Sequence, residues 1–277
     1  MQTVLANQTP ESGRLDPYPH LVIEQALPDD LLDELCRSMP SIRELAGRTW
    51  GRSNVRGNVG SGQIASDARF AEVWREFVRV HTSQEFLADL LRVFASGLTA
   101  FHPDFETRFG AAEELEAVAR STPIGPGQVG LEALLGYNTP VTGEATSVRG
   151  AHLDRPDKLF AGLLYLRDPK DDSVGGDFEI YRDKAGTTDL DHRLETSAAD
   201  LEVHATVPYA GNTLVLFLNS PAAFHGVTPR SATPHPRVFV NFVGELTEPL
   251  FAVDAAALPL HSRIGAAAVR RWWGHTE

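Results

Sequence analysis

The feature that most constrains the fold is a series of short β-like segments that begins near residue 130 and continues to about residue 245. Gly, Pro, Asp and Asn residues separate the segments, as they do between the strands of a β-rich core. Helical stretches do not alternate with these segments, so a doubly wound parallel sheet is disfavoured and a jelly-roll barrel is expected. The predicted strands are residues 131–137, 145–152, 160–167, 177–182, 201–207, 213–218 and 238–244.

The N-terminal third of the chain is predicted to be mainly helical. Residues 1–16 suggest a flexible polar arm, followed by a strand over residues 20–24 and a helix over residues 28–39. Residues 103–120 are also expected to be helical. Two more helices follow from apolar residues at helical spacing. One carries Phe70, Val73, Trp74 and Phe77, and the other begins at a capping box of Thr82 and Glu85 and carries Phe86, Leu87, Leu90, Leu91 and Phe94.

Together these patterns predict one α+β domain over residues 1–277 with a mainly β core. The core, at about residues 130–245, is expected to be a double-stranded β-helix, the jelly-roll barrel also found in cupins, with the N-terminal helices packed outside it. The sequence contains no internal repeat, domain linker or low-complexity segment. One β-rich domain of this length is ordinary.

The charge of the chain limits its partners. Its 277 residues include 25 Lys and Arg but 37 Asp and Glu, so the formal net charge is −12. Such an excess of negative charge repels polyphosphates, and nucleic acid is therefore not an expected partner. It allows a cationic or neutral substrate without demanding one.

Cysteine use and the N-terminus indicate the compartment. The single cysteine, Cys36, cannot form an internal disulfide, which fits a reducing environment. It lies in a helix-like stretch with Leu32, Leu35 and Met39 and is expected to be buried. The first 16 residues lack the basic and apolar regions of a signal peptide, and no apolar run is long enough to span a bilayer. A cytoplasmic location without membrane association is expected.

The candidate metal ligands begin with His152 and Asp154 in the sequence RGAHLD. Side chains at positions i and i+2 of a strand point the same way, so both can reach one metal ion. His225, after the apolar segment 214–218, is the best candidate for a third ligand. Two imidazoles and one carboxylate form the facial triad that holds non-haem Fe(II) and leaves positions open. A structural zinc site would instead be closed and usually rich in cysteine.

The long polar loop over residues 183–200 is either a lid over this site or a solvated insertion. It contains a rival metal-like cluster of Asp189, Asp191 and His192. A flexible polar loop is poorly suited to hold ligands in a preorganised site, so the first cluster is preferred.

Arg237 opens the predicted strand RVFVNFVG and shares one face of it with Phe239 and Asn241. A cation at the entrance of an apolar barrel needs an anionic partner. A guanidinium binds a carboxylate through two parallel hydrogen bonds, so Arg237 suits the carboxylate of a ligand. Arg230, in the turn-rich sequence TPRSATPHP, remains a competitor for this role.

The pattern HLD, His225 and Arg237 resembles the HxD…H…R signature of Fe(II)/2-oxoglutarate oxygenases. Residues 16–35, DPYPHLVIEQALPDDLLDEL, resemble the opening segment of a bacterial branch related to prolyl hydroxylases. The segment 177–181, after Gly175 and Gly176, resembles the GGDxxxY strand of that branch. The resemblance covers roughly residues 16–245.

The resemblance implies specific roles. Iron would be bound by His152, Asp154 and His225, and Arg237 would hold the distal carboxylate of 2-oxoglutarate, with O₂ as the oxidant. The family's halogenases lack the carboxylate ligand, so Asp154 implies hydroxylation or a related oxidation. Apart from the resemblance, one compact domain and the acidic balance favour a small-molecule substrate, and the Ala- and Arg-rich composition is associated with a biosynthetic tailoring role. Candidates for cosubstrate or substrate contacts, with a place in turns or at the surface as the alternative, are Asn138, Ser147, Arg149 and Lys158.

Several alternatives remain open at this point. A cupin-like metal enzyme that does not use 2-oxoglutarate would share the barrel but would not need Arg237. A non-catalytic ligand-binding barrel should have lost a metal ligand, and none is missing from the sequence. The substrate, the oligomeric state and the choice among hydroxylation, desaturation, cyclisation and epimerisation are not determined by these residues.

Overall fold

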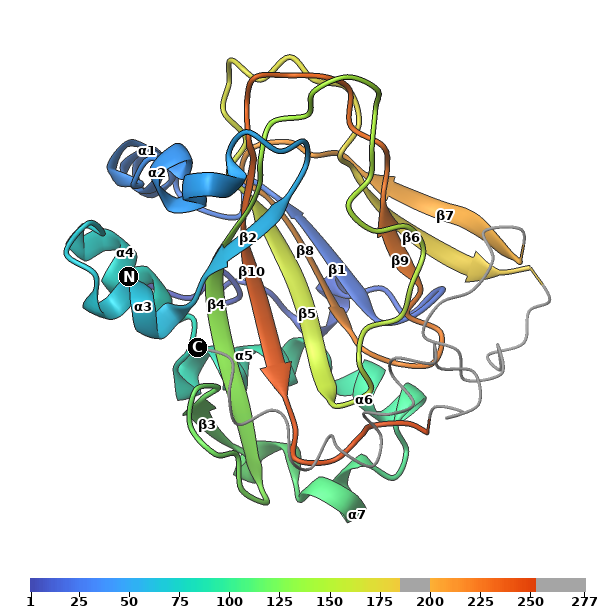
Figure 1. Ribbon diagram of the computed structural model, residues 1–277. Coiled ribbons are helices and arrows are strands. Elements are labelled where there is room, and N and C mark those ends of the chain that lie inside the picture. The colour runs from blue at the N-terminus through green and yellow to red at the C-terminus, as the bar shows by residue number, and fades with distance from the viewer. Residues whose placement is uncertain (185–199, 253–277) are drawn as a thin grey trace.

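Two β-sheets lie side by side in the computed structural model, which describes residues 1–184 and 200–252 (Figure 1). The larger sheet has the order β1-β8-β5-β10-β4-β2, with β3 parallel to β4 and every other pair antiparallel. Its strands are β1 (His20–Glu24), β2 (Arg56–Val59), β3 (Glu116–Ala119), β4 (Gln128–Asn138), β5 (Lys158–Tyr165), β8 (Thr213–Leu218) and β10 (Arg237–Glu245). The smaller sheet has the order β7-β6-β9, with β6 (Phe178–Asp183), β7 (Leu201–Val207) and β9 (His225–Val227).

The chain passes repeatedly from one sheet to the other. It runs from β4 in the larger sheet to His152, which bridges His225 at the edge of the smaller sheet. It returns for β5, crosses to β6 and β7, returns for β8, crosses to β9 and ends in β10. This alternation is that of a double-stranded β-helix. The expected α+β fold with a jelly-roll core is therefore confirmed.

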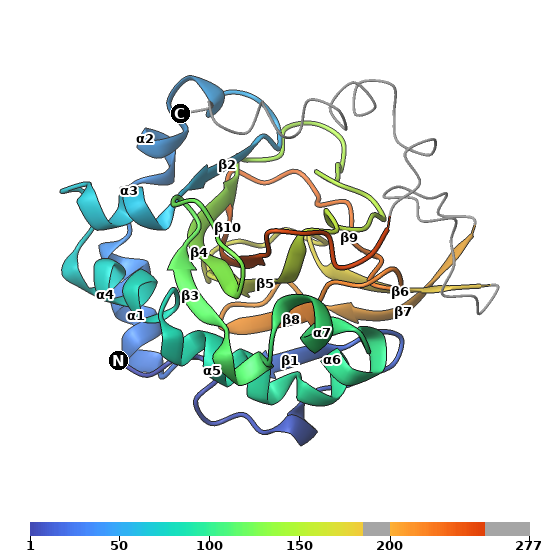
Figure 2. The same ribbon diagram turned by 90° about the horizontal axis from the view of Figure 1, so that it is seen from below.

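The helices cover the larger sheet on the face turned away from the smaller sheet (Figure 2). In β8, Leu214, Leu216 and Leu218 pack among the residues beneath the helices, whereas Val215 and Phe217 pack between the sheets. The alternation follows from the two-residue period of a strand. The α-helices are α1 (Asp29–Ser38), α2 (Ile42–Ala46), α3 (Ser61–Ser66), α4 (Glu72–Val80), α5 (Gln84–Val93), α6 (Ala95–Phe101) and α7 (Phe105–Phe109). Short 3-10 turns span Pro10–Ser12, Gly47–Thr49 and Ala112–Glu114.

The N-terminal residues, expected to form a flexible arm, pack against α4 and α5. Val4 and Leu5 are buried, and the backbone N–H of Val4 donates to Nε2 of His81 at 3.0 Å. The hydroxyl of Thr3 donates to Asp89 at 2.5 Å. Burial of Val4 and Leu5, together with the hydrogen bond from Val4 to the buried imidazole of His81, fixes the position of this otherwise polar segment.

Two expectations for the helical third were wrong in detail. Cys36 is exposed, because the packed face of α1 is centred on Leu35, whose carbonyl accepts from the indole N–H of Trp74. Helix α5 is capped by Ser83, whose hydroxyl accepts from the backbone N–H of Phe86. The hydroxyl of Thr82 instead donates to the carbonyl of Val78 in the preceding helix.

Residues 103–120 are only partly helical. Helix α7 ends at Gly110, whose φ of +97° breaks the helical backbone, and residues 116–119 then form strand β3. The strand predicted over residues 145–152 is reduced to isolated bridges at Thr146 and His152. Conversely, strand β2 lies within the glycine-rich stretch 51–62, where no strand was predicted. Within the described ranges, no helix is long and apolar enough to cross a membrane. Residues 264–273, for which the sequence predicts a short helix, lie outside those ranges.

Phe242 gives a test of the packing between α4, α5 and the larger sheet. Its side chain is fully buried, with ring centroids of Phe77 and Phe86 at 6.3 and 5.6 Å. Replacing it with alanine leaves a cavity, so the free energy of unfolding should fall by about 3–5 kcal/mol in denaturant titrations. The control Val203→Ala, at a side chain that is 52% exposed, should change it by less than about 0.5 kcal/mol. A similar small change in Phe242→Ala would contradict the packing.

Candidate metal centre

A cavity of about 270 Å³ opens between the two sheets, and His152, Asp154 and His225 line it. His225 begins β9, and a pair of backbone hydrogen bonds of 2.9 and 3.0 Å joins it to His152. This antiparallel bridge sets the two imidazoles next to each other, with ring centroids 4.2 Å apart. The rings of Phe178 and Phe217 lie 5.4 and 4.5 Å from that of His225 and shield it from water.

Local hydrogen bonds orient both imidazoles. Nδ1 of His152 lies 2.7 Å from the carbonyl of Gly150, and Nδ1 of His225 lies 2.9 Å from the carbonyl of Ala223. A carbonyl oxygen only accepts, so we assign the ring proton to Nδ1 in each case. Each Nε2 then keeps its lone pair for a metal ion, and a partner on the second nitrogen is the usual support of a metal-bound histidine.

Asp154 completes the cluster. Its two carboxylate oxygens lie 4.0 Å from Nε2 of His152 and 4.0 Å from Nε2 of His225, respectively. All three candidate ligand atoms lie within 4.8 Å of one another, and all three side chains are buried. In the parts of the chain that the structure describes, no other cluster of three such residues is found. The rival cluster of Asp189, Asp191 and His192 falls outside the described residues.

The electrostatic environment keeps both imidazoles neutral and the carboxylate ionised. Burial lowers the pKa of His152 to about 2, with help from the neighbouring His225, and burial also lowers the pKa of His225. Burial alone would raise the pKa of Asp154, but Lys158, 3.1 Å away, and the two imidazoles bring it below its ordinary value. At neutral pH the cluster therefore offers two neutral imidazoles and a carboxylate, the protonation states that metal binding needs.

The donor set fits a divalent transition metal with an open coordination sphere. Two nitrogens and one oxygen from three side chains leave sites for exogenous ligands, as in the facial triad of non-haem iron sites. The single cysteine, Cys36, is on α1 and does not line the cavity, so a closed thiolate zinc site is not formed.

Arg237 enters the same cavity from the start of β10 and is 5% exposed. Its Nε donates to the carbonyl of Gly176 at 2.9 Å, and one terminal nitrogen donates to the hydroxyl of Tyr165 at 3.2 Å. Its guanidinium also lies about 5 Å from the ring centroids of Tyr165, Tyr209 and Phe239. No carboxylate of the described residues pairs with it. Arg237 is thus a rigidly held buried cation without an anion.

The Gly175–Gly176 pair makes this arrangement possible. Both residues have φ near +80°, which favours glycine. A Cβ at position 175 would stand 2.0 Å from the carbonyl oxygen of Pro229, so no larger residue could bring the chain this close. The close approach of Gly175 to Pro229 places the Gly176 carbonyl within hydrogen-bond distance of Arg237.

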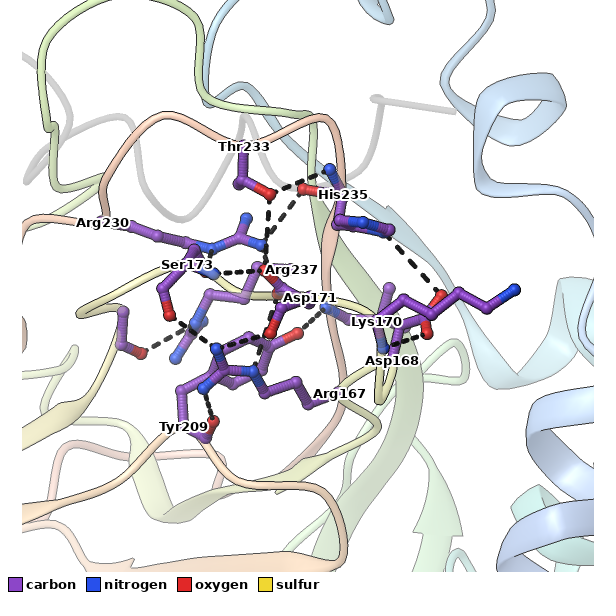
Figure 3. Close-up of polar contacts among 12 residues, drawn as sticks. Arg167, Asp168, Lys170, Asp171, Ser173, Tyr209, Arg230, Thr233, His235 and Arg237 are labelled. Carbon is purple, nitrogen blue, oxygen red and sulfur yellow. Dashed lines mark hydrogen bonds and ion pairs between the residues drawn. The ribbon is translucent and has the colours of Figure 1, made fainter.

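Arg230 also lines the cavity, but its charge is already neutralised (Figure 3). One terminal nitrogen lies 2.5 Å from a carboxylate oxygen of Asp171, and its Nε donates to the hydroxyl of Ser173 at 2.9 Å. The side chain is 2% exposed, although it lies in the turn-rich sequence TPRSATPHP. Of the two competing arginines, Arg237 is therefore the one with an unmatched charge.

The other predicted contact residues lie around the same cavity. Asn138 of β4 pairs in register with Arg237, is 2% exposed, and its amide nitrogen has no hydrogen-bond partner among the described residues. The hydroxyl of Ser147 donates to the carbonyl of Val227 at 2.6 Å. This bond links the segment between β4 and β5 to β9. Arg149 and Lys158 approach a carboxylate oxygen of Asp154 at 3.8 and 3.1 Å.

Arg56 is a cavity residue that the sequence analysis missed. It begins β2, pairs in register with Asn138, and its guanidinium lies 5.3 Å from the ring centroid of Phe239. Arg237 approaches the same ring at 5.1 Å. The signal was weak because β2 is short and lies among glycines, so only its pairing with β4 brings Arg56 to the cavity.

Comparison of the sequence with protein-family models and with curated proteins finds no match. Among solved structures, a prolyl-4-hydroxylase from Pseudomonas putida is 19% identical, with 89% of this chain and 100% of that chain covered and a TM-score of 0.44. HygX from Streptomyces hygroscopicus, with nickel and 2-oxoglutarate bound, is 14% identical, with 84% and 85% covered and a TM-score of 0.43. SnoN, a non-haem alpha-ketoglutarate-dependent epimerase from nogalamycin biosynthesis, is 15% identical, with 82% and 76% covered and a TM-score of 0.44. At such low similarity, function has to be inferred from the site itself.

The metal centre predicts that the protein binds about one Fe(II) per chain when prepared without oxygen, because one facial triad holds one ion. His225→Ala removes a ligand and should abolish stoichiometric binding, measured as metal content after gel filtration. His204→Ala is the matched control, since His204 is exposed on β7 and should keep full binding. Circular dichroism of both variants separates metal loss from unfolding. Full iron content in folded His225→Ala would refute the assignment.

Proposed function

We propose that this protein is an Fe(II)- and 2-oxoglutarate-dependent oxygenase that oxidises an unactivated C–H bond of a small molecule. The observation that carries the proposal is the unneutralised guanidinium of Arg237 in the same cavity as the open triad. A buried cation is costly without a partner, and the carboxylate of a ligand in this cavity would supply one. 2-Oxoglutarate is such a ligand, with a keto acid at one end and a carboxylate at the other.

Residues on two adjacent strands would hold the distal carboxylate. Arg237 would bind it through its guanidinium, and the amide nitrogen of Asn138 is a free donor directly across β4 and β10. The contacts of Arg237 with Gly176 and Tyr165 fix its side chain before the ligand arrives, so little side-chain entropy is lost on binding. Burial raises the pKa of Tyr165 to about 12, so its hydroxyl stays protonated and neutral beside the guanidinium.

Each part of the site has a separate task in this proposal. Iron, when bound with 2-oxoglutarate and O₂, would supply the oxidation chemistry. His152, Asp154 and His225 would position the metal, and Lys158 holds the Asp154 carboxylate in its unprotonated form. Phe178, Phe217 and Phe239 line the cavity and limit water in the region where a substrate C–H bond would lie. Because Asp154 occupies the carboxylate position, hydroxylation or a related oxidation is proposed rather than halogenation.

Arg237→Ala tests the cosubstrate. Removal of one partner from a buried charge pair costs about 2–5 kcal/mol of binding. The dissociation constant of 2-oxoglutarate, titrated without oxygen into Fe(II)-loaded protein, should therefore rise roughly 30-fold or more, at about 1.4 kcal/mol per tenfold. Arg237→Lys should recover only part of the loss, because an ammonium cannot make the planar two-bond contact.

Arg79→Ala is the surface control, since Arg79 is exposed on α4 and pairs only with Glu76 among the described residues. Arg230→Ala is less suitable, because it would leave the Asp171 carboxylate buried without its cation and lower stability. Succinate formation on addition of oxygen is the second readout. Unchanged 2-oxoglutarate affinity in Arg237→Ala would favour a cupin-like enzyme that does not use this cosubstrate.

A further inference from the structure

The charge of the cavity is opposite to that of the chain. Among the described residues, its lining includes five cations and one acid, Asp154. The whole chain has 25 Lys and Arg against 37 Asp and Glu. The cations are Arg56, Arg149, Lys158, Arg230 and Arg237. The net charge of the chain allowed a cationic or neutral substrate, but a ligand inside the cavity meets this local field first.

The proposed metal and cosubstrate do not cancel this excess. Asp171 neutralises Arg230, which leaves four cations facing Asp154. The two carboxylates of 2-oxoglutarate would balance the two charges of a divalent metal ion, so the excess of four cations over one carboxylate on the protein would remain even though Arg237 contacts the cosubstrate. Lys158 lies closest to Asp154, and Arg237 is assigned to the cosubstrate. The cations left over are Arg56 and Arg149.

Both remaining arginines line the cavity and are partly exposed to solvent. The side chain of Arg149 is 46% exposed, and it touches Asp154 only at 3.8 Å, farther than Lys158. Arg56 is also exposed and has no carboxylate partner among the described residues. Burial lowers the pKa of Arg56, and the positive charges of Arg237 and Arg149 lower it further. The three guanidinium groups therefore act on one another across a shared space.

The ring of Phe239 lies close to both Arg56 and Arg237. Arg56 lies 5.3 Å from its centroid and Arg237 lies 5.1 Å from it. Because Arg237 is assigned to the cosubstrate, Arg56 and Arg149 are the cavity cations left for a second anion. The apolar part of a ligand would meet Leu163, Val227 and Phe217, which also line the cavity.

We propose that the primary substrate is a small anion whose oxyanion group is bound by Arg56 and Arg149. That the bound anion is the substrate rests on the proposed function. The anion site itself does not. The group that two guanidiniums recognise is a carboxylate or a tetrahedral oxyanion such as a phosphate or sulfate ester. The cavity that would hold this group has a volume of about 270 Å³.

The test uses acetate as the carboxylate probe, sulfate as the tetrahedral probe and acetamide as the neutral isostere of acetate. Each is titrated at constant ionic strength into the full-length protein saturated with Mn(II) and 2-oxoglutarate, and the thermal unfolding midpoint is followed. A ligand that binds only the folded state raises this midpoint, and its concentration dependence gives a dissociation constant. Acetate or sulfate should give a saturable rise, and acetamide should not. The stronger anion identifies the group.

Arg56→Gln and Arg149→Gln should each weaken the anion about tenfold or more, which equals roughly 1.4 kcal/mol. Arg56→Lys should retain part of the affinity, since it keeps the charge. Arg79→Gln, on the outer surface, is the control and should not change it. The thermal unfolding midpoints of the ligand-free variants show whether a glutamine variant is unstable. If it is, the anion affinity of the charge-retaining lysine variant is compared with that of the unmodified protein instead.

The proposal is overturned if neither anion gives a saturable response, if acetamide matches acetate, or if Arg56→Gln and Arg149→Gln behave like Arg79→Gln. It is also overturned if the anions bind only when 2-oxoglutarate is left out, because the cosubstrate position would then be the one anion site. A failure of Mn(II) or 2-oxoglutarate binding contradicts the proposed function alone. The anion titrations of the metal-free protein would still report on Arg56 and Arg149.

Discussion

The short antiparallel bridge between His152 and His225 is the contact on which the rest of the site depends. Two backbone hydrogen bonds join residues 73 positions apart and place their imidazoles side by side. Each imidazole is then turned by a carbonyl two residues before it. The site therefore needs no long strand at this edge. It needs two residues held in register, and β6 holds His225 in place by pairing with β9.

The second organising constraint is the handling of positive charge. Five cations surround a cavity that contains one carboxylate among the described residues. The protein treats them differently: Arg230 is paired with Asp171, Lys158 with Asp154, and Arg237 only with neutral groups. That difference separates a structural arginine from one suited to bind a ligand. Burial alone would not, since both Arg230 and Arg237 are almost inaccessible to solvent.

The sequence predicted the elements whose determinants are local. The strands β7 and β8 follow from unbroken β-like segments, and His152 and Asp154 follow from ligand residue types at short spacing. His225, far along the chain, was found by its place after the apolar segment 214–218. What it missed depends on partners far along the chain. Arg230 finds its carboxylate 59 residues away at Asp171, and Arg56 reaches the cavity only because a glycine-rich stretch pairs with β4. Cys36 was misplaced because the packed face of α1 is narrower than its apolar spacing suggested.

The unpaired state of Arg237 and Asn138 has a consequence for the evolution of the chain. A buried guanidinium without an anion, next to a buried amide without an acceptor, raises the free energy of the empty barrel. Apolar replacements at these two positions would relieve that cost, yet they would remove the groups that a ligand needs. Stabilising apolar substitutions would therefore be accepted at Arg237 and Asn138 unless selection for ligand binding opposed them. The presence of both residues implies such selection.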